Sequence, residues 1–208
     1  ASTAGKVKLL FPMITSLNEL RQAKAVLEEV KEDLRKERVP FDEEMPVGIM
    51  VETPSAAIIT DLLAPEVDFF SIGSNDLIQY MLAIDPVNER IARLYEPTHP
   101  AVLRMLKLIA DSAERAGVDL SICGEIAGDL PLVLVLLGFG MKKFSMVATA
   151  IPEVKKLIRS VSYEEMKKLS ARLLVLSTAE EVRQEIQRSM AELLADYTDY
   201  ELFVWSRA

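Results

Sequence analysis

Short apolar runs alternate along this chain with longer segments in which apolar residues recur every three or four positions. The first pattern is typical of buried strands and the second of amphipathic helices. Because the two alternate, the sequence predicts an α/β protein whose parallel sheet is covered on both faces by the connecting helices. Strands are predicted at residues 7–14, 47–51, 67–72, 118–122 and 144–146.

Helices are predicted between and after these strands. Ser16 is expected to cap the first one, which carries an apolar face formed by Leu17, Leu20, Leu27, Val30 and Leu34. A charged turn is expected at residues 35–42, and a proline-rich loop at residues 85–100. Further helices are predicted at 53–63, 77–81, 102–116, 130–137, 151–159, 163–176 and 179–194.

Several helix ends carry recognisable signals. Gly117 follows a predicted helix and is a good C-terminal cap. Three helix starts show a Ser with Glu three residues later, which is the capping-box pattern. These pairs are Ser16 with Glu19, Ser162 with Glu165, and Ser177 with Glu180.

Composition narrows the class of protein. The 208 residues, half of them hydrophobic, are enough for one folded domain over residues 1–208, with an uncertain tail from about residue 196. A net charge of −8 without a basic stripe argues against nucleic-acid binding, and no apolar run reaches membrane-span length. Cys123 is the single cysteine, so no internal disulfide forms, and a reducing cytoplasm fits. His99, the single histidine, is assigned no role, and no Cys/His cluster suggests zinc.

Two carboxylates follow strands that are consecutive in the sequence. Glu52 comes directly after the strand at 47–51, and Asp76 follows the strand at 67–72. Because the carboxyl ends of neighbouring parallel strands lie at one rim of the sheet, these groups are expected to converge. Such a pair suits Mg²⁺, which takes one or two carboxylates and completes its shell with water and substrate oxygens. The alternative is that Asp76 caps the next helix and Glu52 is solvated.

The turn Gly73-Ser74-Asn75 opens the helix after the third strand. Backbone N–H groups at a helix start favour an anion, so a phosphate could bind there with the Asn75 amide as a further donor. The alternative is an Asn tolerated in a tight turn. Cys123 ends the fourth strand. It is either a small buried apolar residue or an acid or nucleophile that faces the pocket.

Three motifs together resemble the phosphoenolpyruvate-utilising enzymes, and most closely the enzyme I branch of the sugar phosphotransferase system. They are Met50-Val51-Glu52-Thr53-Pro54, Phe69 to Tyr80 with its central Gly73-Ser74-Asn75-Asp76, and Cys123 to Asp129. The resemblance covers about residues 6 to 190. It implies the C-terminal part of a (β/α)₈ barrel that binds phosphoenolpyruvate and Mg²⁺, while a histidine on an upstream domain accepts the phosphoryl group.

The resemblance also implies roles for single residues. Glu52 and Asp76 are the expected Mg²⁺ ligands, and Asn75 is the expected phosphate contact, with Gly73, Ser74 and Asp76 also at the substrate. Cys123 is the expected acid that protonates the enolate carbon of the product. Positioned charge and a positioned acid are what this reaction requires.

The chain departs from the family pattern in two ways. It matches about five of the eight barrel strands, so the upstream strands, two substrate-binding arginines and the phosphohistidine domain lie outside it. Pro86 stands where the family commonly has an arginine, and Leu130-Pro131 stands where it often has a charged residue. Two alternatives therefore stay open: a non-catalytic module for dimerisation or regulation, and part of a pyruvate phosphate dikinase or phosphoenolpyruvate synthase.

Expected partners follow from the same resemblance. They are phosphoenolpyruvate and pyruvate, the upstream phosphohistidine domain, and the phosphocarrier protein. The chain starts with Ala-Ser-Thr rather than Met, which suits a processed start or a piece of a longer protein. An open barrel has unpaired edges, and four aromatic residues fall within 197–205. We therefore expect a homodimer that buries these edges or the family's dimer surface.

Overall fold

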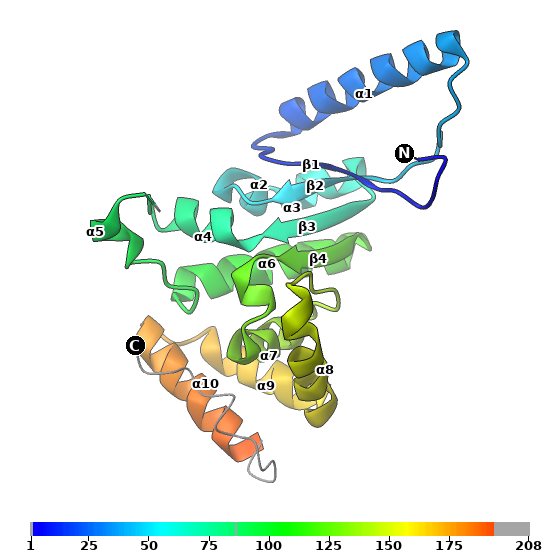
Figure 1. Cartoon of the computed structure of the whole chain (residues 1–208). Helices are drawn as coiled ribbons and strands as arrows, with labels where there is room; N and C mark the ends of the chain where they lie inside the picture. The colour runs from blue at the N-terminus through cyan, green and yellow to red at the C-terminus, as the bar shows by residue number, and fades with distance from the viewer. Residues whose placement is uncertain (1, 86, 194–208) are drawn as a thin grey trace.

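A four-stranded parallel sheet forms the centre of the computed structural model, which describes residues 2–85 and 87–193. The strand order equals the chain order, β1-β2-β3-β4, so each crossover joins two neighbouring strands (Figure 1). The α/β class with a parallel sheet is therefore confirmed. The strands are β1 (Leu9–Phe11), β2 (Val47–Val51), β3 (Phe69–Gly73) and β4 (Asp119–Cys123).

The pairing register decides where the strands end. Val51 lies opposite Ile72, and Gly73 lies opposite Cys123. The residues that follow Val51, Gly73 and Cys123 consequently leave the sheet at the same rim. This rim corresponds to the carboxyl ends of the strands, where α/β proteins place their sites.

Helices connect the strands and continue after β4. In Figure 1, α1 lies on the β1 side of the sheet, whereas α7, α8, α9 and α10 gather beyond β4 at the opposite end. Three short 3₁₀ segments are η1 (Ala64–Glu66), η2 (Glu125–Ala127) and η3 (Ala148–Ala150). The helices are α1 (Leu17–Glu37), α2 (Pro54–Ile58), α3 (Thr60–Leu63), α4 (Ser74–Met81), α5 (Glu89–Ala92), α6 (Pro100–Ala116), α7 (Leu130–Gly138), α8 (Ile151–Ser160), α9 (Tyr163–Leu173) and α10 (Ala179–Leu193).

The apolar helix α7 joins this end of the molecule to the core. Nearly all its residues are buried, so it has no polar face. It packs closely on α9, where the Ser170 hydroxyl donates to the Val135 carbonyl at 2.9 Å. A Cβ atom at Gly138 would overlap the α9 backbone at Met166, which explains why α7 ends in glycine at this crossing.

The fifth predicted strand is reduced to a single parallel bridge between Ile122 and Phe144. Ile122 donates to the Lys143 carbonyl at 3.0 Å, and Ser145 donates to the Ile122 carbonyl at 2.8 Å. The segment leaves the sheet at once because Val147 leads into η3. The predicted loop at residues 85–100 likewise contains a short helix, α5.

One predicted capping box is wrong. Ser162 and Glu165 form the reciprocal pair as expected. At the start of α10, however, the capping residue is Thr178, whose hydroxyl accepts from Glu181 N at 3.2 Å. The Glu181 carboxylate in turn accepts from the Ser177 and Thr178 N–H groups at 2.9 and 3.0 Å. The predicted box at Ser177 and Glu180 is therefore shifted by one residue, because both alternatives fit the local pattern.

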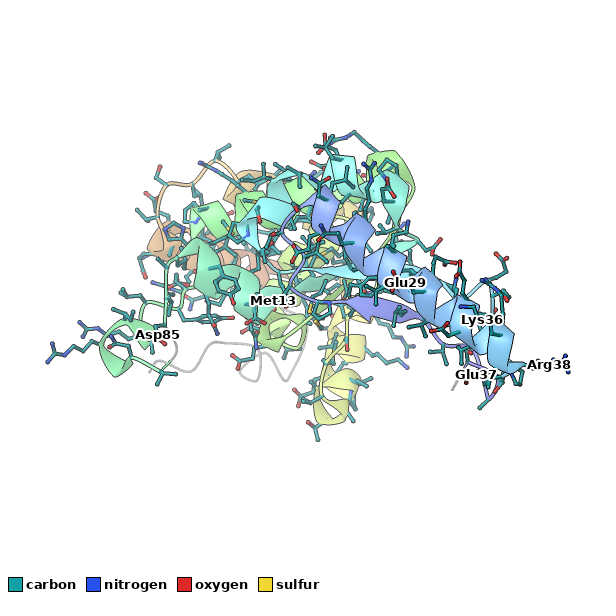
Figure 2. The ribbon with its side chains drawn as sticks, turned by 90° about the horizontal axis from the view of Figure 1, so that it is seen from above. Met13, Glu29, Lys36, Glu37, Arg38 and Asp85 are labelled. Carbon is teal, nitrogen blue, oxygen red and sulfur yellow. The ribbon has the colours of Figure 1, made fainter. Side chains whose placement is uncertain are left out.

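Helix α1 is longer and less covered than its sequence predicts. It includes residues 35–37 of the predicted turn and ends at Arg38, which adopts a left-handed conformation. Leu20 is its one fully buried residue, while Val30 of the predicted apolar face is 50% exposed. The reason is geometric: the far half of α1, with Lys36 and Arg38, extends past the sheet (Figure 2).

Among the described residues, no helix combines the length and apolar character needed to cross a membrane. The predicted aromatic tail at 197–205 lies outside the described residues.

Candidate active site at the carboxyl ends of the strands

Glu52 is the first residue after β2 and is a buried carboxylate, only 3% exposed. Its Oε1 atom accepts a hydrogen bond from the Met13 backbone N–H at 2.7 Å. The next residue, Thr53, donates its hydroxyl to the Ile14 carbonyl at 2.8 Å. These two bonds fasten the loop after β1 to the loop after β2. They fix one carboxylate oxygen of Glu52 and its orientation.

The Asp76 carboxylate lies beside Glu52. Burial raises the pKa of Glu52, the Met13 N–H acts against this increase, and the nearby negative Asp76 increases it further. No basic side chain pairs with Glu52 or Asp76 in the part of the chain that the structure describes. Asp76 lies in the first turn of α4 but does not cap it, since the N-cap position is Gly73. The site therefore concentrates negative charge without a protein cation.

Gly73 makes room for this pair. A Cβ atom there would lie 2.7 Å from Glu52 Oε2 and 2.9 Å from Glu52 Cβ. Within residues 2–85 and 87–193, no group of three or more His, Cys, Asp or Glu side chains forms a complete metal cage. Two carboxylates that lack a cation nonetheless suit Mg²⁺, because this ion keeps several waters and binds substrate oxygens. The residues present fit the metal in this sense.

The turn from β3 into α4 is tied to the end of β4. The buried Ser74 hydroxyl donates to the Cys123 carbonyl at 2.7 Å. Asn75 Oδ1 accepts from the Glu125 N–H at 3.0 Å. The Ser74 hydroxyl is thus used within the protein, and only its backbone remains for a ligand. No side chain caps α4, so its first N–H groups are available to an anion.

Cys123 lies half-buried at the end of β4, where its thiol donates to the Ile72 carbonyl at 3.3 Å. Burial raises the pKa of the Cys123 thiol, and the negative charges of Glu52 and Asp76 raise it further. A side-chain hydrogen bond with Ser71 lowers this pKa but does not cancel the increase. The thiol therefore stays protonated at neutral pH. A protonated thiol can deliver a proton but is a poor nucleophile, so of the two reactive roles the environment favours the acid.

An open cavity of about 690 Å³ lies in front of Cys123 and Asn75, and Glu52 and Asp76 are not among its lining residues. Asn75, Cys123 and Glu125 line it on the sheet side, and Ser145 to Val147 line it on the other. The strand end reaches this position through Gly124, whose φ of +98° is a conformation that L side chains rarely adopt. All the residues predicted from the sequence, Glu52, Gly73, Ser74, Asn75, Asp76 and Cys123, thus lie at one rim.

The sequence predicts no specific role for three groups that shape this rim. Met13 has a left-handed backbone with φ of +56°, which no sequence pattern predicts for methionine. Glu125 and Tyr95 lie next to Asn75 in a smaller cavity. The position of Tyr95 depends on how the loop after α4 folds back.

His99, which was given no role, has a structural one, because its Nδ1 accepts from Ala101 N at 3.1 Å at the start of α6.

A first prediction concerns the strained backbone at Met13. We expect Met13→Val to lower the free energy of unfolding by about 2 kcal/mol, because a β-branched side chain fits the left-handed region poorly. Met13→Gly should stay within about 0.5 kcal/mol of the parent chain, since relief of strain offsets the greater freedom of the unfolded chain. Urea denaturation measures both changes.

Arg38→Val is the matched control, because Arg38 has φ of +60° at the far end of α1 (Figure 2). It should cost similar stability. Only Met13→Val should raise the pKa of Glu52 further, because only this change weakens the N–H bond to its carboxylate. Carboxyl ¹³C NMR distinguishes the two variants, and identical Glu52 titrations would contradict the role of Met13.

Comparison with known families identifies the family of this chain. Residues 1–163 match the family described as "PEP-utilising enzyme, PEP-binding domain". The chain therefore belongs to the phosphoenolpyruvate-utilising enzymes, as its three motifs suggested.

Its relatives within this family are phosphoenolpyruvate-protein phosphotransferases. The protein of that name from Haemophilus influenzae is 48% identical over 192 residues, which are 92% of this chain and 33% of the relative. The one from Staphylococcus carnosus is 44% identical over 95% of this chain and 33% of its own length, and that from Bacillus subtilis is 47% identical over 88% and 32%. The chain spans about a third of the length of the curated relatives it matches.

Solved structures agree on the fold alone. A citrate lyase from Burkholderia xenovorans aligns with a TM-score of 0.53 at 17% identity, covering 95% of this chain and 68% of that one. The malate synthase of Haloferax volcanii aligns with a TM-score of 0.55 at 15% identity, covering 93% and 56%. These folds resemble the (β/α)₈ barrel, which is consistent with the barrel of the phosphoenolpyruvate-utilising enzymes.

Proposed function

We propose that this chain is the phosphoenolpyruvate-binding part of a cytoplasmic phosphoenolpyruvate-protein phosphotransferase. In this role it binds phosphoenolpyruvate with Mg²⁺ and passes the phosphoryl group to a histidine on an upstream domain, from which a phosphocarrier protein takes it. The observation that carries the proposal is the convergence of two carboxylates and one protonated thiol beside an uncapped helix start. The family and the named relatives support the same reaction.

Each residue has a defined task in this proposal. Glu52 and Asp76 hold Mg²⁺, which neutralises negative charge on the phosphate and the enolate. The first N–H groups of α4 and the Asn75 amide bind phosphate oxygens. After the phosphoryl group leaves, the Cys123 thiol gives its proton to the methylene carbon of the enolate. This forms the methyl group of pyruvate and leaves a thiolate, which solvent must reprotonate.

The isolated chain allows a direct test of this proposal. Because the acceptor histidine and the upstream arginines implied by the family lie outside it, it should not turn over phosphoenolpyruvate. Calorimetry with phosphoenolpyruvate and Mg²⁺ should show weak or no binding. Extending the chain by the upstream residues of its gene should give Mg²⁺-dependent binding and labelling of a histidine. An extended protein that binds no phosphoenolpyruvate would overturn the proposal. Micromolar binding by the chain alone would show that the upstream arginines contribute less to substrate binding than we expect.

A second prediction separates the two chemical steps. In the extended protein, Cys123→Ser should slow enolate protonation about 10²- to 10⁴-fold, the usual contribution of a positioned acid. Transfer of the phosphoryl group to histidine should fall much less. Exchange of the pyruvate methyl protons in D₂O, followed by NMR, reports the first step, and radiolabelled phosphohistidine reports the second. Equal losses in both steps would argue against an acid role for Cys123.

Assembly is the second candidate role. The exposed apolar residues Val26 and Val30 on α1, 58% and 50% exposed, favour a covering partner, and β1 lies at the edge of the sheet. We expect a homodimer in solution. Light scattering over a concentration series should give about twice the chain mass of 23.2 kDa. A mass that stays at the monomer value at every concentration would exclude the dimer.

A further inference from the structure

The Tyr95 hydroxyl is a buried polar group without a partner. Among side-chain atoms of the described residues, it is the one buried nitrogen or oxygen that makes no hydrogen bond. Leaving a buried hydroxyl unpaired costs on the order of 1–3 kcal/mol, so such groups commonly serve a ligand or a second conformation. Burial raises the pKa of Tyr95 to about 12, with the charges of Glu125 and Asp76 acting in the same direction. The hydroxyl thus keeps its proton and remains a donor.

The Tyr95 side chain lines a side cavity that adjoins the larger cavity in front of Cys123. This side cavity, about 190 Å³, is lined by Tyr95 together with Asn75, Gln79, Ile84, Ala92 and Glu125. Asn75 and Glu125 also line the larger cavity in front of Cys123. These two residues therefore form the wall between the two spaces, and the Glu125 backbone is fixed there by Asn75 Oδ1.

The Glu125 carboxylate can face either space. Its side chain is exposed, and no hydrogen bond or ion pair of its carboxylate is found in the described part of the chain. A carboxylate at the wall of the larger cavity repels a phosphate or a carboxylate that enters there. Turned toward the side cavity, the same carboxylate would find the one unpaired hydroxyl, which carries a proton.

We propose that Tyr95 is a positioning residue: when an anion occupies the larger cavity, the Glu125 carboxylate turns into the side cavity and accepts a hydrogen bond from the Tyr95 hydroxyl. The exchange removes a negative charge from the path of the anion and satisfies the buried donor. It also holds Glu125 while its backbone N–H keeps Asn75 in place. The inference rests on the proposed function for the identity of the anion, phosphoenolpyruvate.

A double-mutant cycle in the protein extended by its upstream residues tests this coupling, because the chain alone is expected to bind phosphoenolpyruvate weakly. Phosphoenolpyruvate with Mg²⁺ is titrated while NMR follows the Glu125 and Asn75 amides and the Tyr95 ¹³Cζ signal. Tyr95→Phe should weaken binding about tenfold, the typical effect of losing a hydrogen bond to a charged group. Glu125→Gln should bind as well as the parent protein or better, and adding Tyr95→Phe to it should change nothing. Tyr163→Phe, an exposed tyrosine on α9, is the control and should bind normally.

Stability provides a readout that a merely structural role would change. Tyr95→Phe removes a hydroxyl without a partner, so its free energy of unfolding should equal or exceed that of the parent chain. Parent-like binding by Tyr95→Phe would overturn the inference, as would the same tenfold loss in the Glu125→Gln background. A loss of stability that accompanies weaker binding would also overturn it.

The proposed function and this inference can fail separately. If the extended protein shows no response to phosphoenolpyruvate, the proposed function fails, and inorganic phosphate serves as the probe. A Glu125 amide response to phosphate that is lost in Tyr95→Phe supports the coupling without the proposed substrate. The same response in both proteins, or no response to either anion, overturns it.

Discussion

Glu52→Gln is expected to reduce phosphoryl transfer from phosphoenolpyruvate on the order of 10³-fold in the extended protein and to stabilise the metal-free fold. If Glu52 and Asp76 hold Mg²⁺ as proposed, the loss follows because Gln cannot supply the negative charge that the ion requires beside Asp76. Stabilisation follows because ionised Glu52 is buried next to another carboxylate without a basic partner. Gln keeps an oxygen for the Met13 N–H and removes the repulsion. We expect a gain of about 1 kcal/mol, as when strained functional sites are relaxed.

The pH dependence gives this prediction its sign. Because the pKa of Glu52 is raised in the folded state, that state binds the Glu52 proton more tightly than the unfolded chain does. Ionisation of Glu52 therefore opposes folding at neutral pH, and this penalty fades as the pH falls through the folded-state pKa. The stability gap between Glu52→Gln and the parent chain should narrow on acidification, measured by urea denaturation in EDTA.

Glu44→Gln is the control for the loss of one negative charge, because Glu44 is exposed and precedes β2, at the opposite end of the strand from Glu52. It should change neither transfer nor the pH profile. A Glu52→Gln protein that retains Mg²⁺-dependent transfer would contradict the metal role of Glu52. A variant that is less stable than its parent at neutral pH would show that the carboxylate pair is better compensated than the structure indicates.

Gly124→Ala is expected to lower the free energy of unfolding by about 3 kcal/mol or more and to abolish substrate binding. Two costs add. An L side chain at φ of +98° is strained. A Cβ atom there would also overlap Ser74 Oγ and lie 2.6 Å from Asn75 Oδ1, so the ties from Ser74 to Cys123 and from Asn75 to Glu125 cannot both persist.

Gly117→Ala separates these costs. Gly117 ends α6 with φ of +68°, and a Cβ atom there would meet nothing within 4 Å. Gly117→Ala should lower the free energy of unfolding only by the cost of backbone strain, about 1 kcal/mol, and leave the site intact. Denaturation curves and phosphoenolpyruvate binding are compared for both variants. Equal losses of stability in the two would show that the contacts of Gly124 with Ser74 and Asn75 are looser than the structure has them.

The sequence by itself determined the elements and the rim at which the chemistry gathers. Strand β2 has the predicted bounds, and α6 ends at Gly117 as its cap signal indicates. These features depend on residues a few positions apart, so a local pattern contains them. The same holds for Glu52, Asp76 and Cys123, because any residue that follows a parallel strand leaves the sheet at its carboxyl end.

Only the tertiary structure decided how those groups are held and which of their atoms remain for a ligand. The bond from Met13 to Glu52 spans 39 positions, that from Ser74 to Cys123 spans 49, and that from Glu125 to Asn75 spans 50. Such bonds arise after the strands pair, so no local pattern contains them. The sequence marks Ser74 as a ligand residue, whereas packing uses its hydroxyl to tie two strand ends together. The unpaired Tyr95 hydroxyl likewise arises only where a long loop folds back over the start of α4.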